Sequence, residues 1–277
     1  MKFKYLGTAA AEGIPALFCE CENCKKARKN GGKDIRTRSQ AIIDDKILID
    51  FPADTYCHTL QHGLDLARIK TCLITHSHSD HLYAPDIEMR KNGFSHIPDC
   101  EPLIFYSDKS GYDMIMDEIK KYNVPEDRVQ VKQLELYKPF EVEGYTVTAI
   151  RAAHGESSSP VVFLIERDGK VLFYSNDTSE YPDEAMEYLK NYGKHIDVLS
   201  LDCTEANAKC TYVGHLTLSR CVALVDKLRE FNLIDDDSRV ILNHFSHNGV
   251  SVLYDDFLPL AKEHGFEVAY DGMEVEI

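Results

Sequence analysis

The stretch Thr75-His76-Ser77-His78-Ser79-Asp80-His81 directly follows the short apolar run Cys72-Leu73-Ile74. It places three imidazoles and one carboxylate within six residues. A helix or strand could not aim all four side chains at one point, but a tight loop at the carboxyl end of a buried strand can. Imidazole and carboxylate together favour zinc, manganese or iron over calcium or magnesium. The stretch therefore predicts a metal-binding loop rather than a solvated histidine-rich loop.

Three further ligand-type residues stand just after other predicted strands. They are His154, Asp177 and His244. Open α/β sheets place their sites at the carboxyl ends of strands. Each of the three alone is better explained as a structural residue. One metal needs only three protein ligands, however, so the loop and these residues together predict two adjacent metals.

The nine cysteines divide into one cluster and six scattered residues. Cys19, Cys21 and Cys24 lie within six residues. Three soft ligands in a reducing compartment suit a structural zinc ion with a fourth ligand from elsewhere, the alternatives being a chance cluster or redox thiols. An odd cysteine count without a signal segment argues against a disulfide framework. The remaining six are expected to be ordinary thiols: Cys57, Cys72, Cys100, Cys203, Cys210 and Cys221.

The composition restricts the class of protein and its partners. The 277 residues carry a formal net charge of −15 and are 44% hydrophobic. No apolar run approaches the about 18–20 residues that a membrane span needs. The acidity weighs against nucleic acid and anionic membranes as partners, because clustered cations supply affinity for phosphate backbones. We expect a cytoplasmic globular protein with one domain over residues 1–277.

One basic stretch departs from the overall acidity. Residues 25–38 contain seven Lys and Arg residues and a single acidic residue, Asp34. Charge runs of this kind are usually solvated loops. The alternative is an anchor for a small anionic substrate.

Short β-patterned runs alternate with amphipathic helical stretches along the chain. Turn residues predict four hairpins: 41–43 with 47–49, 140–142 with 145–152, 161–165 with 171–174, and 266–270 with 273–277. Buried strands are expected at 72–74, 196–201 and 240–242, and helices at 109–121, 182–192, 216–231 and 252–264. These elements predict an α/β domain in which two mixed sheets pack together and helices flank them.

The order His-x-His-x-Asp-His, a lone His, a later Asp and a last His resembles the metal signature of the metallo-β-lactamase superfamily. The resemblance implies an αββα sandwich with a dinuclear site at one edge. It also implies two divalent ions, Mn or Zn with Fe as a further option, in the active site. One metal would be held by His76, His78 and His154, the other by Asp80, His81 and His244, and Asp177 would bridge them.

Residues 6–15, which run into the cysteine cluster, and residues 265–274 resemble the PhnP family of cyclic phosphodiesterases. That resemblance implies that His247 completes the zinc site, forming a zinc knuckle at 19–24. His244 and His247 stand three residues apart after one strand, so each could serve a different metal. The knuckle would then brace the loop that carries His244. PqqB-type proteins share a similar cysteine knuckle.

The resemblance further implies a proton donor near the start of the helix at 216–231. His215 is the candidate to protonate the leaving oxygen, and Asp80 would orient or deprotonate the attacking water. The alternative for His215 is a residue at a helix N-terminus with no catalytic part. Arg36, Arg38 or Arg90 would hold a second phosphate or a ribose.

We therefore expect hydrolysis of a small, anionic, cyclic phosphate ester by a hydroxide that two metals share, with a homodimer left open. Another hydrolase on the same scaffold is the first alternative: a lactonase, a thioesterase or a β-lactamase. A tRNA-end nuclease conflicts with the net charge. A non-catalytic PqqB-like protein and a redox di-iron centre complete the alternatives.

Overall fold

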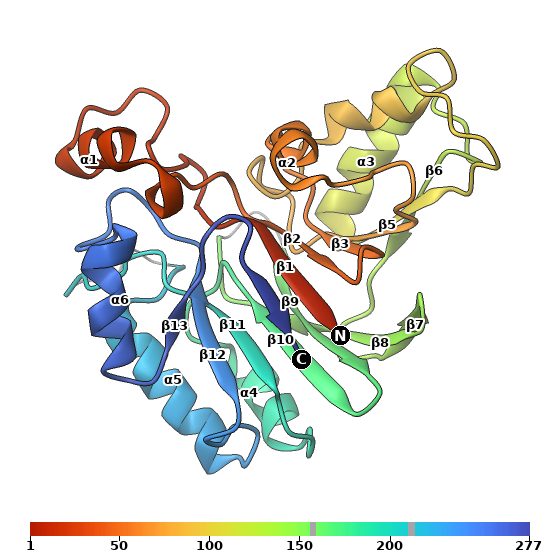
Figure 1. Cartoon of the computed structure of the whole chain (residues 1–277). Helices are drawn as coiled ribbons and strands as arrows, with labels where there is room; N and C mark the ends of the chain where they lie inside the picture. The colour runs from red at the N-terminus through yellow and green to blue at the C-terminus, as the bar shows by residue number, and fades with distance from the viewer. Residues whose placement is uncertain (156–158, 210–213) are drawn as a thin grey trace.

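The computed structural model describes residues 1–155, 159–209 and 214–277 (Figure 1). Within these ranges the strands form two seven-stranded sheets. The first has the order β14-β1-β2-β3-β4-β5-β6, and the second has the order β13-β12-β11-β10-β9-β8-β7. Each sheet is antiparallel at one end and parallel at the other, so both are mixed.

The strands of the first sheet are β1 (Lys2–Gly7), β2 (Gln40–Ile43), β3 (Ile47–Ile49), β4 (Thr71–Leu73), β5 (Leu103–Ser107), β6 (Val129–Gln133) and β14 (Glu274–Glu276). Those of the second are β7 (Phe140–Val142), β8 (Tyr145–Arg151), β9 (Val161–Arg167), β10 (Lys170–Ser175), β11 (Val198–Asp202), β12 (Arg239–Asn243) and β13 (Glu267–Val268). The helices are α1 (Glu22–Asn30), η1 (Gly32–Asp34), α2 (Thr55–His62), η2 (Ala84–Arg90), α3 (Lys109–Tyr122), α4 (Asp183–Lys190), α5 (Leu218–Glu230) and α6 (Tyr254–Lys262).

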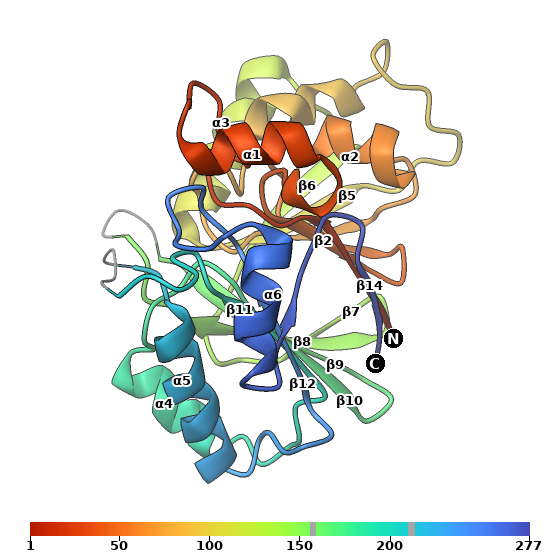
Figure 2. The same ribbon diagram turned by 60° about the vertical axis from the view of Figure 1, so that its left-hand side comes forward.

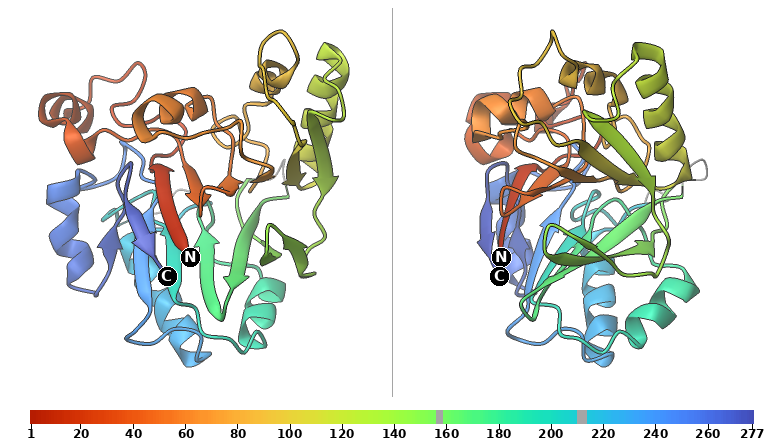
Figure 3. Two further views of the ribbon diagram at one scale, coloured as in Figure 1. Left: turned by 45° about the vertical axis from the view of Figure 1, so that its right-hand side comes forward. Right: turned by 90° about the vertical axis from the view of Figure 1, so that its right-hand side faces the viewer.

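Apolar side chains alternate between two cores along each strand. In β3, Ile47 and Ile49 enter the core between the two sheets, whereas Leu48 packs on the outer face. Successive strand residues point to opposite faces, so continuously apolar strands must be covered on both sides. Helices α2, α3 and η2 lie over the first sheet and α4, α5 and α6 over the second (Figures 2 and 3). The predicted αββα sandwich is confirmed.

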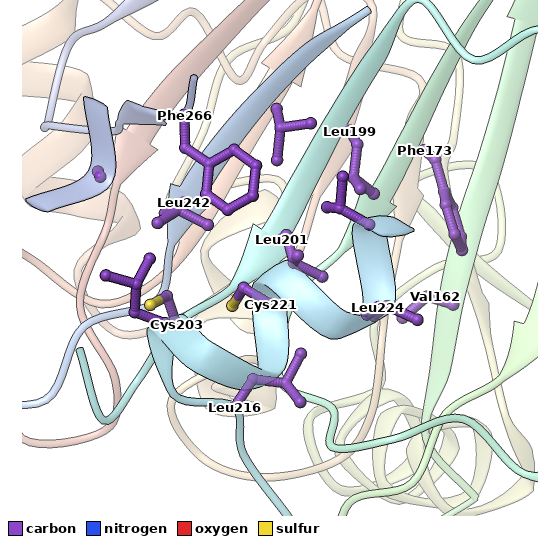
Figure 4. Packing of buried hydrophobic residues seen from close by; sticks show 14 of the residues in the cluster. Val162, Phe173, Leu199, Leu201, Cys203, Leu216, Cys221, Leu224, Leu242 and Phe266 are labelled. Carbon is purple, nitrogen blue, oxygen red and sulfur yellow. The ribbon is translucent and has the colours of Figure 1, made fainter. Parts of the chain in front are cut away.

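Helix α5 shows how the outer layer is held. Cys221, Leu224 and Leu228 recur at the spacing of one helix face and are buried against the second sheet. Leu201 and Leu242 on neighbouring strands meet this face, together with Phe173 (Figure 4). Burying a large aliphatic side chain contributes about 1.5–3 kcal/mol. This packing anchors the carboxyl ends of β11 and β12.

Three of the four predicted hairpins are confirmed, and the predicted hairpin at 266–277 is wrong. Strand β13 pairs in parallel with β12 in the second sheet, whereas β14 pairs antiparallel with β1 in the first. The turn at Asp271-Gly272 therefore crosses between the sheets. The three predicted buried strands and the four predicted helices are present, with ends shifted by a few residues.

The sequence predicted a solvated loop over residues 25–38. The structure differs, because part of this stretch is helical. Its first part belongs to α1, whose N-cap Cys21 accepts a hydrogen bond from the Cys24 amide. Arg28 and Lys29 fall in the last turn of this helix, where they offset the negative end of the helix dipole. Across the described ranges, no helix is long and apolar enough to cross a membrane.

Candidate metal centre

The predicted ligands converge at one edge of the sandwich, where strands of both sheets end. The loop after β4 supplies His76, and the chain after β10 and β12 supplies Asp177 and His244. Asp177 and His244 adopt φ values of +55° and +63°. Non-glycine residues rarely take this left-handed conformation, and such residues cluster at functional sites. The fold thus holds both residues in a rarely adopted backbone conformation.

Three overlapping sets of donor atoms lie at this edge, and within each set the atoms are within 4.8 Å of one another. One of them joins Asp202 and His215 to Asp177 and His244. The other two contain the predicted ligands. The first consists of His76, His78, His154 and Asp177. The second consists of Asp80, His81, Asp177 and His244. Asp177 belongs to both, as expected of a bridging ligand. The structure therefore brings together all seven residues that the sequence predicted, in the predicted grouping.

The donor atoms converge, but they do not satisfy one another's hydrogen-bonding capacity. His76 Nε2 and Asp177 Oδ1 are buried without a hydrogen-bond partner among the described residues. Asp177 Oδ2 lies 3.1 Å from His76 Nε2, and His154 Nδ1 lies 3.1 Å from Asp177 Oδ1. His244 Nε2 lies 3.3 Å from His81 Nε2. Buried polar atoms are normally satisfied, so unsatisfied atoms that converge indicate an ion. Nitrogen and carboxylate donors suit zinc, manganese or iron.

In four of the imidazoles a neighbouring oxygen contacts Nδ1 and orients the ring. His81 Nδ1 lies 2.7 Å from Asp50 Oδ2, and His154 Nδ1 lies 3.1 Å from the carbonyl oxygen of Gly214. His76 Nδ1 and His244 Nδ1 contact the hydroxyls of Thr75 and Thr204 at 3.2 and 2.9 Å. Such contacts fix the ring orientation and leave the other nitrogen, Nε2, for a metal.

The electrostatics of the cluster favour an ionised bridging carboxylate. Burial raises the pKa of Asp177, but His244, His76 and His81 outweigh it and hold that pKa well below its ordinary value. Burial lowers the pKa of His154 to about 4, even though Asp177 opposes this shift. A neutral imidazole and a charged carboxylate are the protonation states that bind metals.

His215 lies against the same cluster with a carboxylate partner. Its Nδ1 is 3.3 Å from Asp202 Oδ2, 3.2 Å from Asp177 Oδ1 and 3.1 Å from the Thr204 hydroxyl. Burial lowers its pKa, but the hydrogen bond and charge of Asp202, with Asp177 and Glu205, raise it to about 9. The same contact helps to lower the pKa of Asp202 to about 2, against burial. Asp202 therefore favours the protonated form of the ring.

A cavity of about 630 Å³ opens over these residues. His78, Asp80, His154, Asp177, His215 and His244 all line it. The chain after β1, with Glu12, the chain after β11, with Glu205, and the loop after β12, with Asn248, also line it. The cavity is large enough for a small organic ester.

The three clustered cysteines and His247 also come together, with donor atoms within 4.8 Å of one another. Cys19 Sγ and Cys21 Sγ each lie 3.5 Å from His247 Nδ1. Burial raises the pKa of Cys21, but hydrogen bonds from the Cys24 amide, His247 and Cys19 lower it to about 6. A thiolate is the form that binds zinc. Asn23 ties the cluster to the loop after β12 through the carbonyls of His247 and Gly249.

The three arginines that were candidates for a substrate anchor do not line the cavity. Arg36 is buried, donates to Thr8 and to the Ala269 carbonyl, and packs on the Phe245 ring. Arg38 pairs with Asp54 and donates to the Ala11 carbonyl. Arg90 donates to three backbone carbonyls in the layer outside the first sheet. The expected anchoring role is not supported, because these guanidiniums have structural partners.

Sequence reasoning missed three residues that orient the site: Asp50, Asp202 and Thr204. Asp50 directly follows β3 and Asp202 is the last residue of β11. The rule that selected Asp177, a carboxylate at the end of an apolar strand, would have found both aspartates. Thr204 carries no comparable signal, because hydroxyl residues are common in loops.

Comparison with known proteins gives the family. A family model described as "Beta-lactamase superfamily domain" matches residues 46–245. A search of curated protein sequences gives no match.

Solved structures extend the likeness to the whole chain. PqqB from Methylobacterium extorquens is 19% identical over 100% of both chains, with a TM-score of 0.78. A diphosphatase from the PhnP family is 22% identical over 100% of this chain and 97% of its own, with a TM-score of 0.74. Human tRNase Z, short form, is 18% identical over 100% and 99%, with a TM-score of 0.68. At these identities the likeness concerns the fold. The chain therefore belongs to the metallo-β-lactamase superfamily.

Proposed function

We propose that this protein is a metal-dependent hydrolase of small phosphodiesters, cyclic ones included. One observation carries the proposal: two donor sets share Asp177, and the His215–Asp202 pair adjoins them in the same cavity. An oriented acid beside a two-cation site is the arrangement that ester hydrolysis with a poor leaving group requires. Residues 1–277 would act as one domain.

The ligands follow from the two donor sets. His76, His78 and His154 would hold one divalent cation, and Asp80, His81 and His244 the other, with Asp177 between them. When bound, the two cations polarise the phosphoryl oxygens and lower the pKa of water toward neutrality. Zinc or manganese, with iron as a further option, suits these donors. A third, structural zinc would be held by Cys19, Cys21, Cys24 and His247.

The chain's own groups orient the reactants and move one proton. Asp80 lines the cavity and is buried, so its carboxylate can accept a hydrogen bond from an attacking water and orient it. His215, whose pKa the Asp202 carboxylate raises, would donate its proton to the departing alkoxide oxygen. Asp202 stabilises the charged ring before transfer and holds its orientation. General acid catalysis of this kind is worth about 10²–10⁴-fold in rate.

The choice of a phosphorus ester rests on two further supports. Two proteins of similar fold are named a diphosphatase and a tRNase, and both names denote phosphorus–oxygen bond cleavage. The net charge of −15 disfavours a long polyanion such as tRNA as the substrate. A small ester satisfies both observations.

The test is an assay on protein whose metal content has been measured. Bis-p-nitrophenyl phosphate, ribose 1,2-cyclic and 2′,3′-cyclic phosphates and a homoserine lactone are the substrates. We expect hydrolysis of at least one diester, its loss with a chelator and its recovery when the metal is returned. Activity on the lactone alone would overturn the proposal in favour of a lactonase. Full metal sites with no hydrolysis would favour a non-catalytic PqqB-like protein.

A further inference from the structure

Two apolar side chains are exposed in the turn that leads into the cysteine cluster. Phe18 is fully exposed, and Leu17 is 63% exposed. The turn is fixed by the Ala16 amide, which donates to Cys24 Sγ at 3.2 Å, and by the Cys19 amide, which donates to the Ala16 carbonyl. Exposed apolar groups of this kind mark interaction surfaces, and a backbone that is already ordered lowers the entropy that binding costs.

Helix α2 adds a second exposed apolar surface. Tyr56 and Leu60 are 69% and 70% exposed and stand four residues apart, so they share one face of the helix. The eight residues of α2 include no Asp, Glu, Lys or Arg, although 28% of the chain is charged. Exposed aromatic residues without charged neighbours are typical of the centre of a protein–protein interface. Figure 1 and the left panel of Figure 3 show α2 between α1 on one side and β5 and β6 on the other.

A cavity of about 220 Å³ lies in the layer outside the first sheet, at the start of β5 and β6. Most of its lining is apolar and includes Leu66, Ile87, Leu103, Phe105 and Val129. Arg90 also lines it, but its guanidinium donates to three backbone carbonyls. Since an apolar cavity of ~150 Å³ accepts benzene, this one has room for a phenyl ring.

Phe18 and the cavity are flanked by opposite charges. On α1, just after Phe18, two exposed cations form no ion pair with any residue that the structure describes: Lys26 and Lys29. The other two cations of this helix have glutamate neighbours. Beside the cavity, three exposed carboxylates pair with no cation of the described chain: Asp99, Glu126 and Asp127. Asp99 stands two residues after the lining residue Ile97, and Asp127 stands two residues before Val129.

We propose that this end of the sandwich is the interface of a homodimer, in which Phe18 of each copy enters the cavity of the other. A two-fold axis near α2 would pair the surfaces of Tyr56 and Leu60, and it would place α1 of one copy beside the acidic rim of the other copy's cavity. A second copy is the partner because this chain supplies both halves of the contact, the ring and the cavity, with complementary charges around them. The inference is independent of the proposed hydrolase function, because the dinuclear donor sets take no part in it.

Sedimentation equilibrium of the full chain over a range of micromolar concentrations tests the dimer. We expect a monomer–dimer equilibrium. Phe18→Ala should raise the dissociation constant at least ~100-fold, because each dimer loses two buried rings. Val222→Ala, at a partly exposed position in α5, is the control and should leave the constant unchanged. A wild-type protein that stays monomeric throughout, or one that assembles beyond the dimer, would overturn the proposal.

A mixing experiment tests whether the ring enters the cavity. Ala67 is an exposed residue of the cavity lining, so Ala67→Trp should block the cavity without disturbing the core. Phe18→Ala and Ala67→Trp each lose both ring–cavity contacts when alone, whereas a heterodimer of the two regains one contact. An equimolar mixture should therefore associate more tightly than either variant. No gain on mixing would refute the insertion of Phe18.

Charge reversal tests the position of α1. The double variant Lys26→Glu and Lys29→Glu should weaken association, and adding Glu126→Lys and Asp127→Lys to the same chain should restore it. All four positions are exposed, so each variant should keep the wild-type melting temperature. Weakening that the second pair of substitutions does not reverse would contradict the placement of α1 beside the cavity.

Discussion

Nδ1 of His81 lies 2.7 Å from Oδ2 of Asp50, and both side chains are completely buried. Asp50 follows β3, His81 follows β4, and the two strands pair in parallel, so their ends are neighbours. The Asp50 carboxylate also accepts hydrogen bonds from the amide and hydroxyl of Thr75. This contact ties the metal-binding loop to the adjacent strand and fixes the face that His81 presents to the cluster.

Asp50→Asn should weaken metal binding at the site of Asp80, His81 and His244. The amide has lost the charge that orients the His81 ring and increases its basicity, and such partners typically contribute 10–100-fold in metal affinity. Competition with a chromogenic chelator measures the affinity. Asp45→Asn, in the exposed turn between β2 and β3, is the control and should bind metal as the wild type does. Unchanged affinity in Asp50→Asn would show that the contact is only structural.

His215→Ala should reduce turnover of phosphodiesters by about 10²–10⁴-fold, because the departing alkoxide loses its proton donor. Metal content, measured by mass spectrometry, should stay the same. Since His215 also lies within reach of Asp177 and His244, loss of one metal equivalent would instead identify it as a ligand. An ester with p-nitrophenolate as leaving group, which needs no proton, should be affected much less.

Asp202→Asn should also lower turnover, because it weakens proton donation by His215. The carboxylate raises the pKa of His215, so its removal lowers the fraction of protonated ring. Residues that act as a unit are not additive. The double variant with His215→Ala should therefore be little slower than His215→Ala alone, and a multiplied loss in kcat would contradict the pairing.

Cys21→Ser should remove one metal equivalent and lower thermal stability. Serine keeps the N-cap of α1, so the change removes the thiolate and little else. Loss of a structural zinc in a protein of this size should lower the melting temperature by at least ~5 °C. Because Asn23 ties α1 to the loop after β12, metal affinity at His244 should fall as well. Cys57→Ser, at a partly exposed position in α2, is the control.

His58 should make the protein less stable in mild acid. Its ring is buried between Gln40 and Thr37, and burial lowers its pKa to about 3. Between that value and the ordinary 6.5, the unfolded chain binds a proton that the folded chain does not. The stabilising contribution is thus complete above pH 6.5 and declines as the pH falls, by up to ~1.4 kcal/mol per pH unit.

Urea denaturation of wild type and His58→Gln between pH 7.5 and 4.5 measures this contribution. The free energy of unfolding should fall more steeply with acid in the wild type, while the difference between the proteins stays constant above pH 7. The metal ligands titrate in both proteins and cancel in the comparison. Parallel curves over the whole range would refute the assignment.

The group of donor residues that the structure brings together was predictable, because each member follows a predicted strand. A donor residue directly after an apolar strand, as at His76 and Asp177, needs only the rule that strand ends meet at one edge of a sheet. The αββα layers were predictable because β4, β11 and β12 are apolar on both faces and must be covered twice. The grouping into two metal sites came from the family resemblance.

The remaining features depend on contacts between residues far apart in the chain. The turn at Asp271-Gly272 has the local chemistry of a hairpin, but Asp271 accepts hydrogen bonds from Thr8 and Thr37, so the chain crosses to the other sheet. The alternative interpretation of the basic stretch was an anion anchor, but Arg36 is buried and donates to Thr8 and to the Ala269 carbonyl, so its role is structural.

The sequence by itself determined which atoms bind metal in our proposal, since donor chemistry is a property of single residues. Only the tertiary structure decided which groups orient those atoms. Asp50 and Asp202 are ordinary acidic residues among 46 in the sequence. Their roles arise from distance and burial, because charges interact strongly only where they are brought close together away from water. Both conditions are set by the folded chain.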